Sequence, residues 1–221
     1  MPSPDRAHGL TPAQWGLGAT LTVYLLASTS FQGRRFEDVL TAARAQPGKL
    51  TVATSGVGTV GNIMLEQIKR NAKVDMIHVP YKGAAQAATD AAGGHFDLFL
   101  SNPSPNLNAL VSKGTLRVLA VTGPARLSSL PETPTFAELG LPQANLTSKF
   151  GLFAPKGIPA DVLKRLNAAV VEVVTKSEVQ DALTRLDNVV AIGSPMQFTA
   201  TLKAESEANE KLIREANIRL E

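Results

Sequence analysis

The sequence predicts an α/β protein built around a largely parallel sheet. Short apolar runs such as "LTVATS" (50–55) and "FDLFLS" (96–101) alternate along the chain with segments of helical periodicity. The links between them are short and contain glycine, which is typical of repeated strand–helix–strand units. Because the runs are continuously apolar, the strands should be buried on both sides, with helices covering both faces of the sheet.

The elements expected up to residue 123 follow in chain order. The run "ATLTVYLLA" (19–27) indicates a buried strand rich in β-branched and aromatic residues. A short amphipathic helix with Phe36, Val39 and Leu40 at helical spacing comes next and stops at Pro47-Gly48. Beyond it we expect strands at 50–55, 74–81, 96–101 and 116–123, and helices at 61–71, 82–94 and 105–113.

The pattern changes from Pro124 onward. Residues 124–148 are rich in proline and indicate a loop with a short helix, which we expect to cross between lobes. A strand at 149–155 and a strong amphipathic helix at 159–176 should follow. Ser177 with Gln180 has the spacing of a capping box, and Ser194-Pro195 predicts the start of a last helix that runs to about Ala216.

Composition narrows the classes of function. Of 221 residues, 44% are hydrophobic and 19% charged, and the formal net charge of +3 mildly favours anionic partners. No basic run interleaved with aromatic residues indicates nucleic-acid binding. The chain has no cysteine and three histidines without metal-ligand spacing, so we expect no metal. The apolar stretch 15–27 is too short to span a bilayer, and the low positive charge of its N-terminal flank favours a buried strand over a signal peptide.

A literal G-x-G-x-x-G motif at Gly56, Gly58 and Gly61 raises the alternative of a dinucleotide site. That site needs an acidic residue at the far end of the next strand, but Asp75 stands at its beginning. A hydrolase built on Ser55 is also unsupported, because Ala53 occupies the first glycine position of G-x-S-x-G. We therefore expect no enzyme activity and no cofactor.

Two successive strand–loop–helix junctions instead suit a small carboxylate. "ATSGVGTVGN" and "VPYKGAAQAATD" each place a glycine loop between a strand and a helix, so that free amides point outward at the helix start. Ser55 and Thr59 would add uncharged hydroxyl donors. In a doubly wound sheet such loops share the edge at which ligands bind. These residues leave one alternative open, namely that both loops are only tight connections between a strand and a helix.

Four segments carry a family resemblance, which runs in order from about Leu17 to Ile218. They are "PGKLTVATSGVGTVGNIMLEQIK", "HVPYKGAAQAATDAAGGHFDLFLSN", "KGTLRVLAVTGPARLSSLPETPTFAELGLP" and "FGLFAPKGIPADVLKRLNAAV". Together they resemble the Bug/TctC family, the extracytoplasmic solute receptors of tripartite tricarboxylate transporters. The resemblance implies a type II periplasmic-binding-protein fold whose two α/β lobes, with parallel-rich sheets, close around a small carboxylate and perform no chemistry on it.

The resemblance also implies a domain organisation and a site. Residues 28–147 would form the second, ligand-binding lobe, residues 15–27 and 148–221 the remainder of an incomplete first lobe, and residues 1–14 an irregular N-terminus. The expected ligand-binding residues are Ser55, Gly58, Thr59, Lys82, Gly83, Ala84, Ala85, Asp90, Asn102 and Ser104. Asp90 as a solvated helix residue, and Asn102 as a turn former before Pro103, remain alternatives.

Three departures from the family stand beside this resemblance. Family members carry a signal peptide and a Gly-rich "PGG" loop ahead of the segment that begins here near Leu17, so we expect an N-terminally truncated member. Lys149 and Asn209 stand where the family usually has an aromatic residue and a tryptophan. The expected function is a periplasmic receptor that delivers organic acids to membrane subunits. The alternative is a member that no longer binds solute and acts as an interaction module.

Overall fold

The computed structural model describes residues 17–151, 157–192, 195–215 and 218. Residues 1–14, expected to form an irregular N-terminus, lie outside the described residues. The chain forms two units, which we treat separately. Unit 1 comprises the residues up to Leu21 and those from Lys149 onward, and unit 2 comprises Thr22–Ser148. The chain therefore enters unit 2 at Thr22 and leaves it after Ser148.

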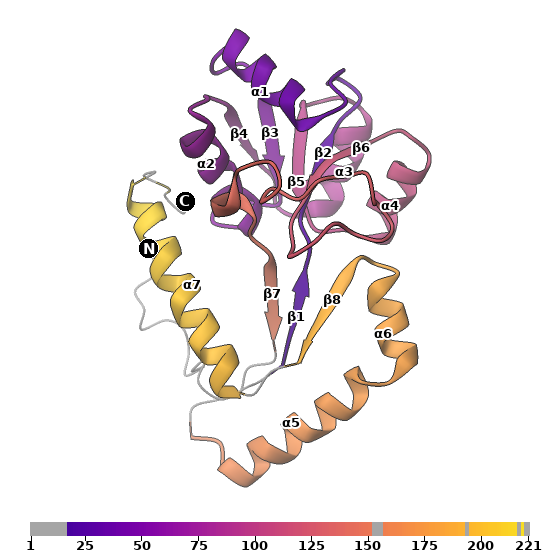
Figure 1. Ribbon diagram of the computed structural model, residues 1–221, viewed down its shortest axis with the longest axis vertical. Coiled ribbons are helices and arrows are strands. Elements are labelled where there is room, and N and C mark those ends of the chain that lie inside the picture. Colours follow the sequence, from indigo (N-terminus) through magenta and orange to yellow (C-terminus); the bar gives the residue numbers. More distant parts are fainter. Residues whose placement is uncertain (1–16, 152–156, 193–194, 216–217, 219–221) are drawn as a thin grey trace. The chain divides into compact units, whose positions relative to one another are not determined.

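Unit 2 contains a five-stranded mixed sheet with the order β4-β3-β5-β2-β6 (Figure 1). β3 is parallel to both β4 and β5, whereas β2 is antiparallel to β5 and β6. The parallel part agrees with the expected sheet, and β2 is the exception. The strand bounds are β2 Tyr24–Ala27, β3 Thr51–Thr54, β4 Ile77–Pro80, β5 Leu98–Ser101 and β6 Arg117–Val121.

The expected single strand at 19–27 is wrong. The structure has two strands there, β1 (Leu17–Leu21) in unit 1 and β2 (Tyr24–Ala27) in unit 2. Residues 22–27, assigned from the sequence to the first lobe, thus lie in the other unit. The physical reason is that Val23 donates its amide to Thr122 Oγ1 at 2.8 Å and accepts from Thr122 N at 3.0 Å, which begins the pairing of β2 with the neighbourhood of β6.

Helices cover both faces of this sheet, and two separate apolar clusters show which face each helix covers. One cluster joins Leu25 of β2 to α1 (Phe36–Ala45) and α2 (Val60–Ala72). The other joins Leu26 to α3 (Ala84–Ala92) and α4 (Pro105–Ser112). Adjacent residues of β2 enter opposite clusters because successive side chains of a strand point to opposite faces.

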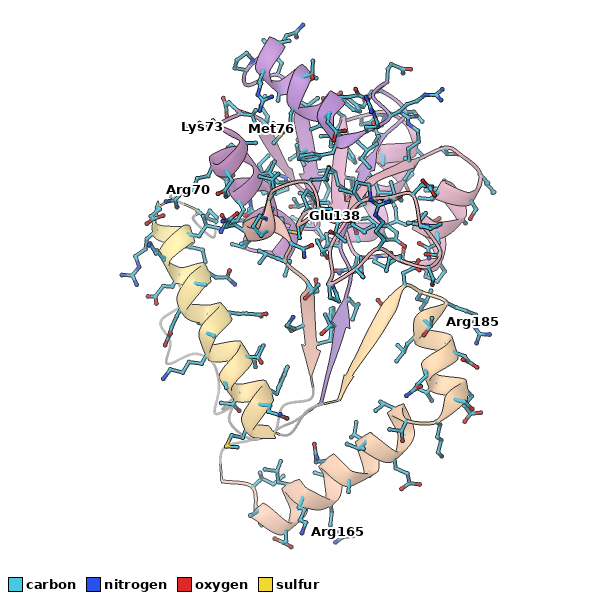
Figure 2. All side chains as sticks on the ribbon, viewed as in Figure 1. Arg70, Lys73, Met76, Glu138, Arg165 and Arg185 are labelled. Carbon is cyan, nitrogen blue, oxygen red and sulfur yellow. The ribbon has the colours of Figure 1, made fainter. Side chains whose placement is uncertain are left out.

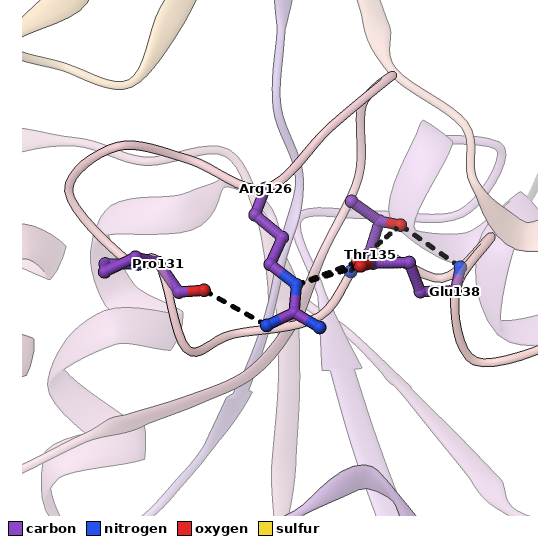
Figure 3. Close-up of polar contacts among 4 residues, drawn as sticks. All are labelled: Arg126, Pro131, Thr135 and Glu138. Atoms are coloured by element: carbon purple, nitrogen blue, oxygen red, sulfur yellow. Dashed lines mark hydrogen bonds and ion pairs between the residues drawn. The ribbon is translucent and has the colours of Figure 1, made fainter.

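The proline-rich segment after β6 belongs to unit 2 and contains one short 3-10 helix, η3 (Pro142–Ala144). Figure 3 shows how its turn is held. Arg126 donates from Nε to Glu138 at 2.9 Å and from Nη1 to the carbonyl of Pro131 at 3.1 Å, while Thr135 N donates to Glu138 at 2.7 Å. The bond from Thr135 N, with help from Arg126, lowers the pKa of Glu138 below its usual value. Residues 124–148, expected to cross between lobes, thus lie wholly within unit 2, and the chain leaves this unit only after Ser148.

Unit 1 contains a three-stranded sheet with the order β7-β1-β8, in which β1 and β8 are antiparallel. The strand β8 was not expected from the sequence. The expected capping box at Ser177 is wrong, because α6 begins after Lys176 without a side-chain cap. No described residue of α5, the helix on which Figure 2 labels Arg165, is buried. The bounds are β7 Ser148–Gly151, β8 Asn188–Ile192, α5 Ala160–Val174, α6 Ser177–Thr184 and α7 Pro195–Glu215.

Candidate functional site

The predicted site residues gather at one edge of the unit 2 sheet. Because β3 lies between β4 and β5 and is parallel to both, the loops that follow these three strands leave the same edge. The amide of Tyr81 donates to the carbonyl of Thr54 at 3.0 Å, so the first two loops are direct neighbours. We call the first one the amide loop (residues 55–59) and the second one the lysine loop (residues 81–83).

The three glycines of the G-x-G-x-x-G motif are explained by backbone geometry. Gly56 and Gly58 have φ angles of 148° and 75°, which other residues rarely adopt. Gly61 lies in the first turn of α2, where an added Cβ would come within 2.9 Å of the Leu100 carbonyl oxygen. Asp75 precedes β4, at the opposite end of that strand from the lysine loop. The motif therefore shapes a tight loop and a close helix–strand contact, without the acidic partner of a dinucleotide site.

Several donors of the amide loop are used inside the loop. Thr59 is the N-cap of α2, accepts from Asn62 N at 3.4 Å, and gives its hydroxyl hydrogen to the Gly56 carbonyl at 2.7 Å. The Gly58 amide donates to Asn62 Oδ1 at 3.0 Å. Within the part of the chain that the structure describes, the half-buried Ser55 side chain makes no hydrogen bond. Of the predicted hydroxyls in this loop, Ser55 is thus the one that can still serve a ligand.

The lysine loop presents an open helix N-terminus. Gly83 is the N-cap of α3 with a φ angle of 133°, and no side chain caps the helix. An added Cβ on Gly83 would meet no atom within 4 Å, so the position faces open space. Ala84 is half-buried, while Lys82 and Ala85 are exposed. The lysine loop therefore brings together free amides, the positive end of a helix and an ammonium group. This combination favours the binding of an anion.

Asp90 supports the lysine loop from inside α3. It accepts a hydrogen bond from the Tyr81 hydroxyl at 2.8 Å, and its other oxygen lies 3.5 Å from His95 Nδ1. Desolvation, together with the carboxylate of Asp90, raises the pKa of Tyr81 to about 12. The Tyr81 ring also packs edge-on against Phe96 at 5.6 Å. Asp90 thus fixes the residue at which the lysine loop begins.

Asn102 and Ser104 have partners within the frame of unit 2. Asn102 Nδ2 donates to the Thr22 carbonyl at 2.8 Å and to Ser148 Oγ at 2.9 Å, so it joins the two ends of unit 2. Ser104 is the N-cap of α4 and accepts from Leu107 N at 3.3 Å. Both side chains lie at the predicted edge of the sheet, where they hold the backbone.

Two residues of this edge were not among the site residues predicted from the sequence. Asn62 is buried in the first turn of α2, and His78 of β4 is half-buried beside it. His78 Nε2 lies 2.7 Å from Thr54 Oγ1, and its Nδ1 lies 3.4 Å from Asn62 Nδ2. The available signal was an asparagine on the otherwise apolar face of a helix, directly after the glycine motif.

The described residues contain no group of three or more His, Cys, Asp or Glu side chains that could hold a metal ion. A search of the described residues also finds no helix with the length and apolar character needed to cross a membrane.

Comparison with known proteins shows which families and structures this chain is similar to. The chain matches the model of the tripartite tricarboxylate transporter family receptor over residues 17–218. A UPF0065 protein from the tcbD–tcbE intergenic region of Pseudomonas sp. strain P51 is 36% identical over 200 residues, which cover 90% of this chain and 59% of that relative. The chain thus spans somewhat more than half the length of this relative.

Two solved structures from Rhodopseudomonas palustris have the same fold. Rpa4515 with adipate superposes with a TM-score of 0.85 at 30% identity, covering 96% of this chain and 70% of that one. MatC with bound malate superposes with a TM-score of 0.80 at 26% identity, covering 92% of this chain and 69% of that one. The fold is that of periplasmic solute-binding proteins.

Proposed function

Because the chain belongs to the tripartite tricarboxylate transporter receptor family, we propose that it binds a small organic carboxylate at the edge formed by the amide and lysine loops. The family and the fold are those of solute-binding proteins, and the adipate and malate of the two solved relatives suggest the class of ligand. The observation that carries the proposal is the uncapped N-terminus of α3, which is open to solvent at Gly83 and adjoins Lys82.

The proposed binding mode assigns a role to each free donor. One carboxylate group receives hydrogen bonds from the backbone amides at the start of α3, and Lys82 supplies long-range attraction. The Ser55 hydroxyl on the neighbouring loop provides a donor without charge. Asp90 and the Thr59 cap hold the two loops in shape. In this mode the ligand carboxylate is bound and released unchanged.

The proposal extends to delivery. We infer that the receptor works in the periplasm and passes its solute to membrane subunits of a tripartite transporter. The support is that the matching family is one of transporter receptors, and that a periplasmic transporter of known structure superposes with a TM-score of 0.85 at 29% identity.

Calorimetry with succinate, malate, adipate and citrate tests binding, and thermal shift provides a second readout. A micromolar dissociation constant corresponds to about 8 kcal/mol, so saturation should raise the melting temperature. Failure of every acid to bind would favour the alternative of an interaction module.

Two substitutions test the site itself. Ala84→Pro removes a backbone donor at the first position of α3, where proline is tolerated, as Pro105 shows at the start of α4. We expect about tenfold weaker binding or more, with an unchanged melting temperature in the absence of ligand. Lys82→Gln should weaken binding by about two- to fivefold, and less at high salt. The exposed Lys113 at the end of α4 provides the matched control, Lys113→Gln, which should bind as the parent does.

A further inference from the structure

The side chain of Asn62 fixes the protonation of His78. Its Oδ1 accepts the Gly58 amide hydrogen at 3.0 Å, which places its Nδ2 toward His78 Nδ1 at 3.4 Å. An amide nitrogen can donate but has no lone pair to accept a hydrogen. His78 Nδ1 must therefore be the acceptor, and the ring carries its single proton on Nε2.

This tautomer determines the direction of the hydrogen bonds on the other side of the ring. The Nε2 hydrogen points to Thr54 Oγ1 at 2.7 Å, and the Gly56 amide also donates to that oxygen, at 3.3 Å. With two hydrogens received, the Thr54 hydroxyl donates its own to the Gly56 carbonyl at 3.0 Å. One continuous chain of bonds thus runs from Gly58 through Asn62, His78 and Thr54 to Gly56.

The chain of bonds begins and ends at the two glycines that adopt positive φ angles in the amide loop. Glycine loses more backbone freedom on folding than any other residue, so these positions depend most on external restraint. A proton on Nδ1 would reverse the donor and acceptor roles between Asn62 and His78. Asn62 would have to rotate, and its NH2 group would then face the Gly58 amide, donor against donor.

The surroundings of His78 agree with a neutral ring. Burial lowers its pKa, and the nearby charge of Lys69 acts in the same direction. Lys69 lies on α2 and pairs with Glu66 at 3.4 Å and, more distantly, with Asp75 at 3.9 Å.

We propose that Asn62 and His78 are positioning residues that set which donors the amide loop offers to its ligand. They turn the Gly58 amide inward, while the Ser55 hydroxyl keeps no partner among the described residues. The consequence for ligand binding rests on the proposed function, whereas the loop geometry and the tautomer do not.

Nitrogen-15 NMR of the histidine rings in the unliganded protein tests the assignment without any ligand. His78 should show a protonated Nε2 and an unprotonated Nδ1 at neutral pH. Observation of a protonated Nδ1 would overturn the proposal, and this measurement needs no variant to fold.

The substitution Asn62→Asp gives the sharper test. The carboxylate still accepts from Gly58, but toward His78 it offers only a second acceptor, which favours a proton on Nδ1. The pKa of His78 should therefore rise by about one unit or more. In Asn62→Leu, amide exchange at Gly58 should accelerate about tenfold or more. His95→Gln, at an exposed histidine that contacts Asp90 and not Asn62, is the control and should change neither value.

Ligand binding gives a separate result. If the chain binds an acid, Asn62→Leu should weaken binding by about tenfold while the Lys113→Gln control stays unchanged. An unaltered pKa of His78 in Asn62→Asp, or an unaltered Gly58 exchange rate in Asn62→Leu, would contradict the positioning role, whether or not any acid binds.

Discussion

Replacing Asn102 with alanine should cost stability more than affinity. The residue was predicted as a ligand contact, but its side chain joins Thr22 to Ser148. Both partners are buried, at 3% and 7% exposure. Asn102→Ala leaves the Thr22 carbonyl without this donor and frees the Ser148 hydroxyl, which can rotate toward another acceptor. At about 1–3 kcal/mol for an unsatisfied buried group, and less for the hydroxyl, the expected loss is about 2–4 kcal/mol.

Urea unfolding followed by circular dichroism measures this loss, with the slope m expected to stay unchanged. Ser148→Ala should cost about 1 kcal/mol, and the double variant less than the sum of the two, because the two side chains are hydrogen-bonded to each other. Amide exchange at Val23, next to Thr22, should accelerate in Asn102→Ala. Stability within about 0.5 kcal/mol of the parent, combined with a tenfold weaker ligand affinity, would refute this reasoning and restore Asn102 as a ligand contact.

Three further predictions concern the two loops. Gly61→Ala should destabilise the protein by about 1–2 kcal/mol, because the added Cβ meets the Leu100 carbonyl at 2.9 Å. This overpacking exceeds the gain in helix propensity. Urea unfolding measures the loss of stability. Thr59→Ala should cost about 1 kcal/mol through loss of the α2 cap, by the same assay. Desolvation and the bond to Asp90 raise the pKa of Tyr81 to about 12, so its neutral hydroxyl contributes stability that is complete below about pH 10 and is lost as pH rises toward 12. Urea midpoints from about pH 9 to about pH 11 should show this loss.

The Gly61 and Tyr81 predictions each have a control. Gly93→Ala places a Cβ closest to the flexible end of His95, at 3.2 Å, and at an ordinary 3.5 Å from the Asp90 carbonyl, so it should stay within about 0.5 kcal/mol of the parent. An equal loss in Gly61→Ala and Gly93→Ala would remove the packing argument. Tyr81→Phe should reduce the alkaline loss of stability. If Thr59→Ala left stability unchanged, the hydroxyl would be free to serve a ligand after all.

Much of the fold could be predicted because local pattern and tertiary environment agree. β3, β5 and β6 are short apolar runs between glycine-containing links, and each lies where the sequence indicates a strand. The break between β1 and β2 could not be predicted. Thr22 and Val23 continue the apolar run, and nothing local distinguishes a strand that changes sheets from one that continues. The short strand β8 lies between helices and was missed because its five residues carry too little periodic signal.

The site was predicted less well than the fold, for a chemical reason. A hydroxyl or amide next to a strand end suits a ligand, a helix cap or a backbone clamp equally well, so residue type alone does not separate these roles. Ser104 caps α4, and Asn102 clamps the ends of unit 2. Asn62 and His78 are sixteen positions apart, and only the packing of α2 beside β4 brings them together. What the sequence did locate was the edge of the sheet and the open start of α3.

The shared hydrogen-bond donor at the two ends of unit 2 has a consequence for protein engineering. Thr22 and Ser148 contact the same nitrogen, although the whole of unit 2 lies between them in the sequence. A segment whose ends are neighbours can be excised, or circularly permuted through a short glycine–serine linker, with little change in the entropy of closing the chain. Because unit 2 also encloses its own two apolar clusters, it should fold as a separate module, in which the proposed carboxylate binding can be tested without unit 1.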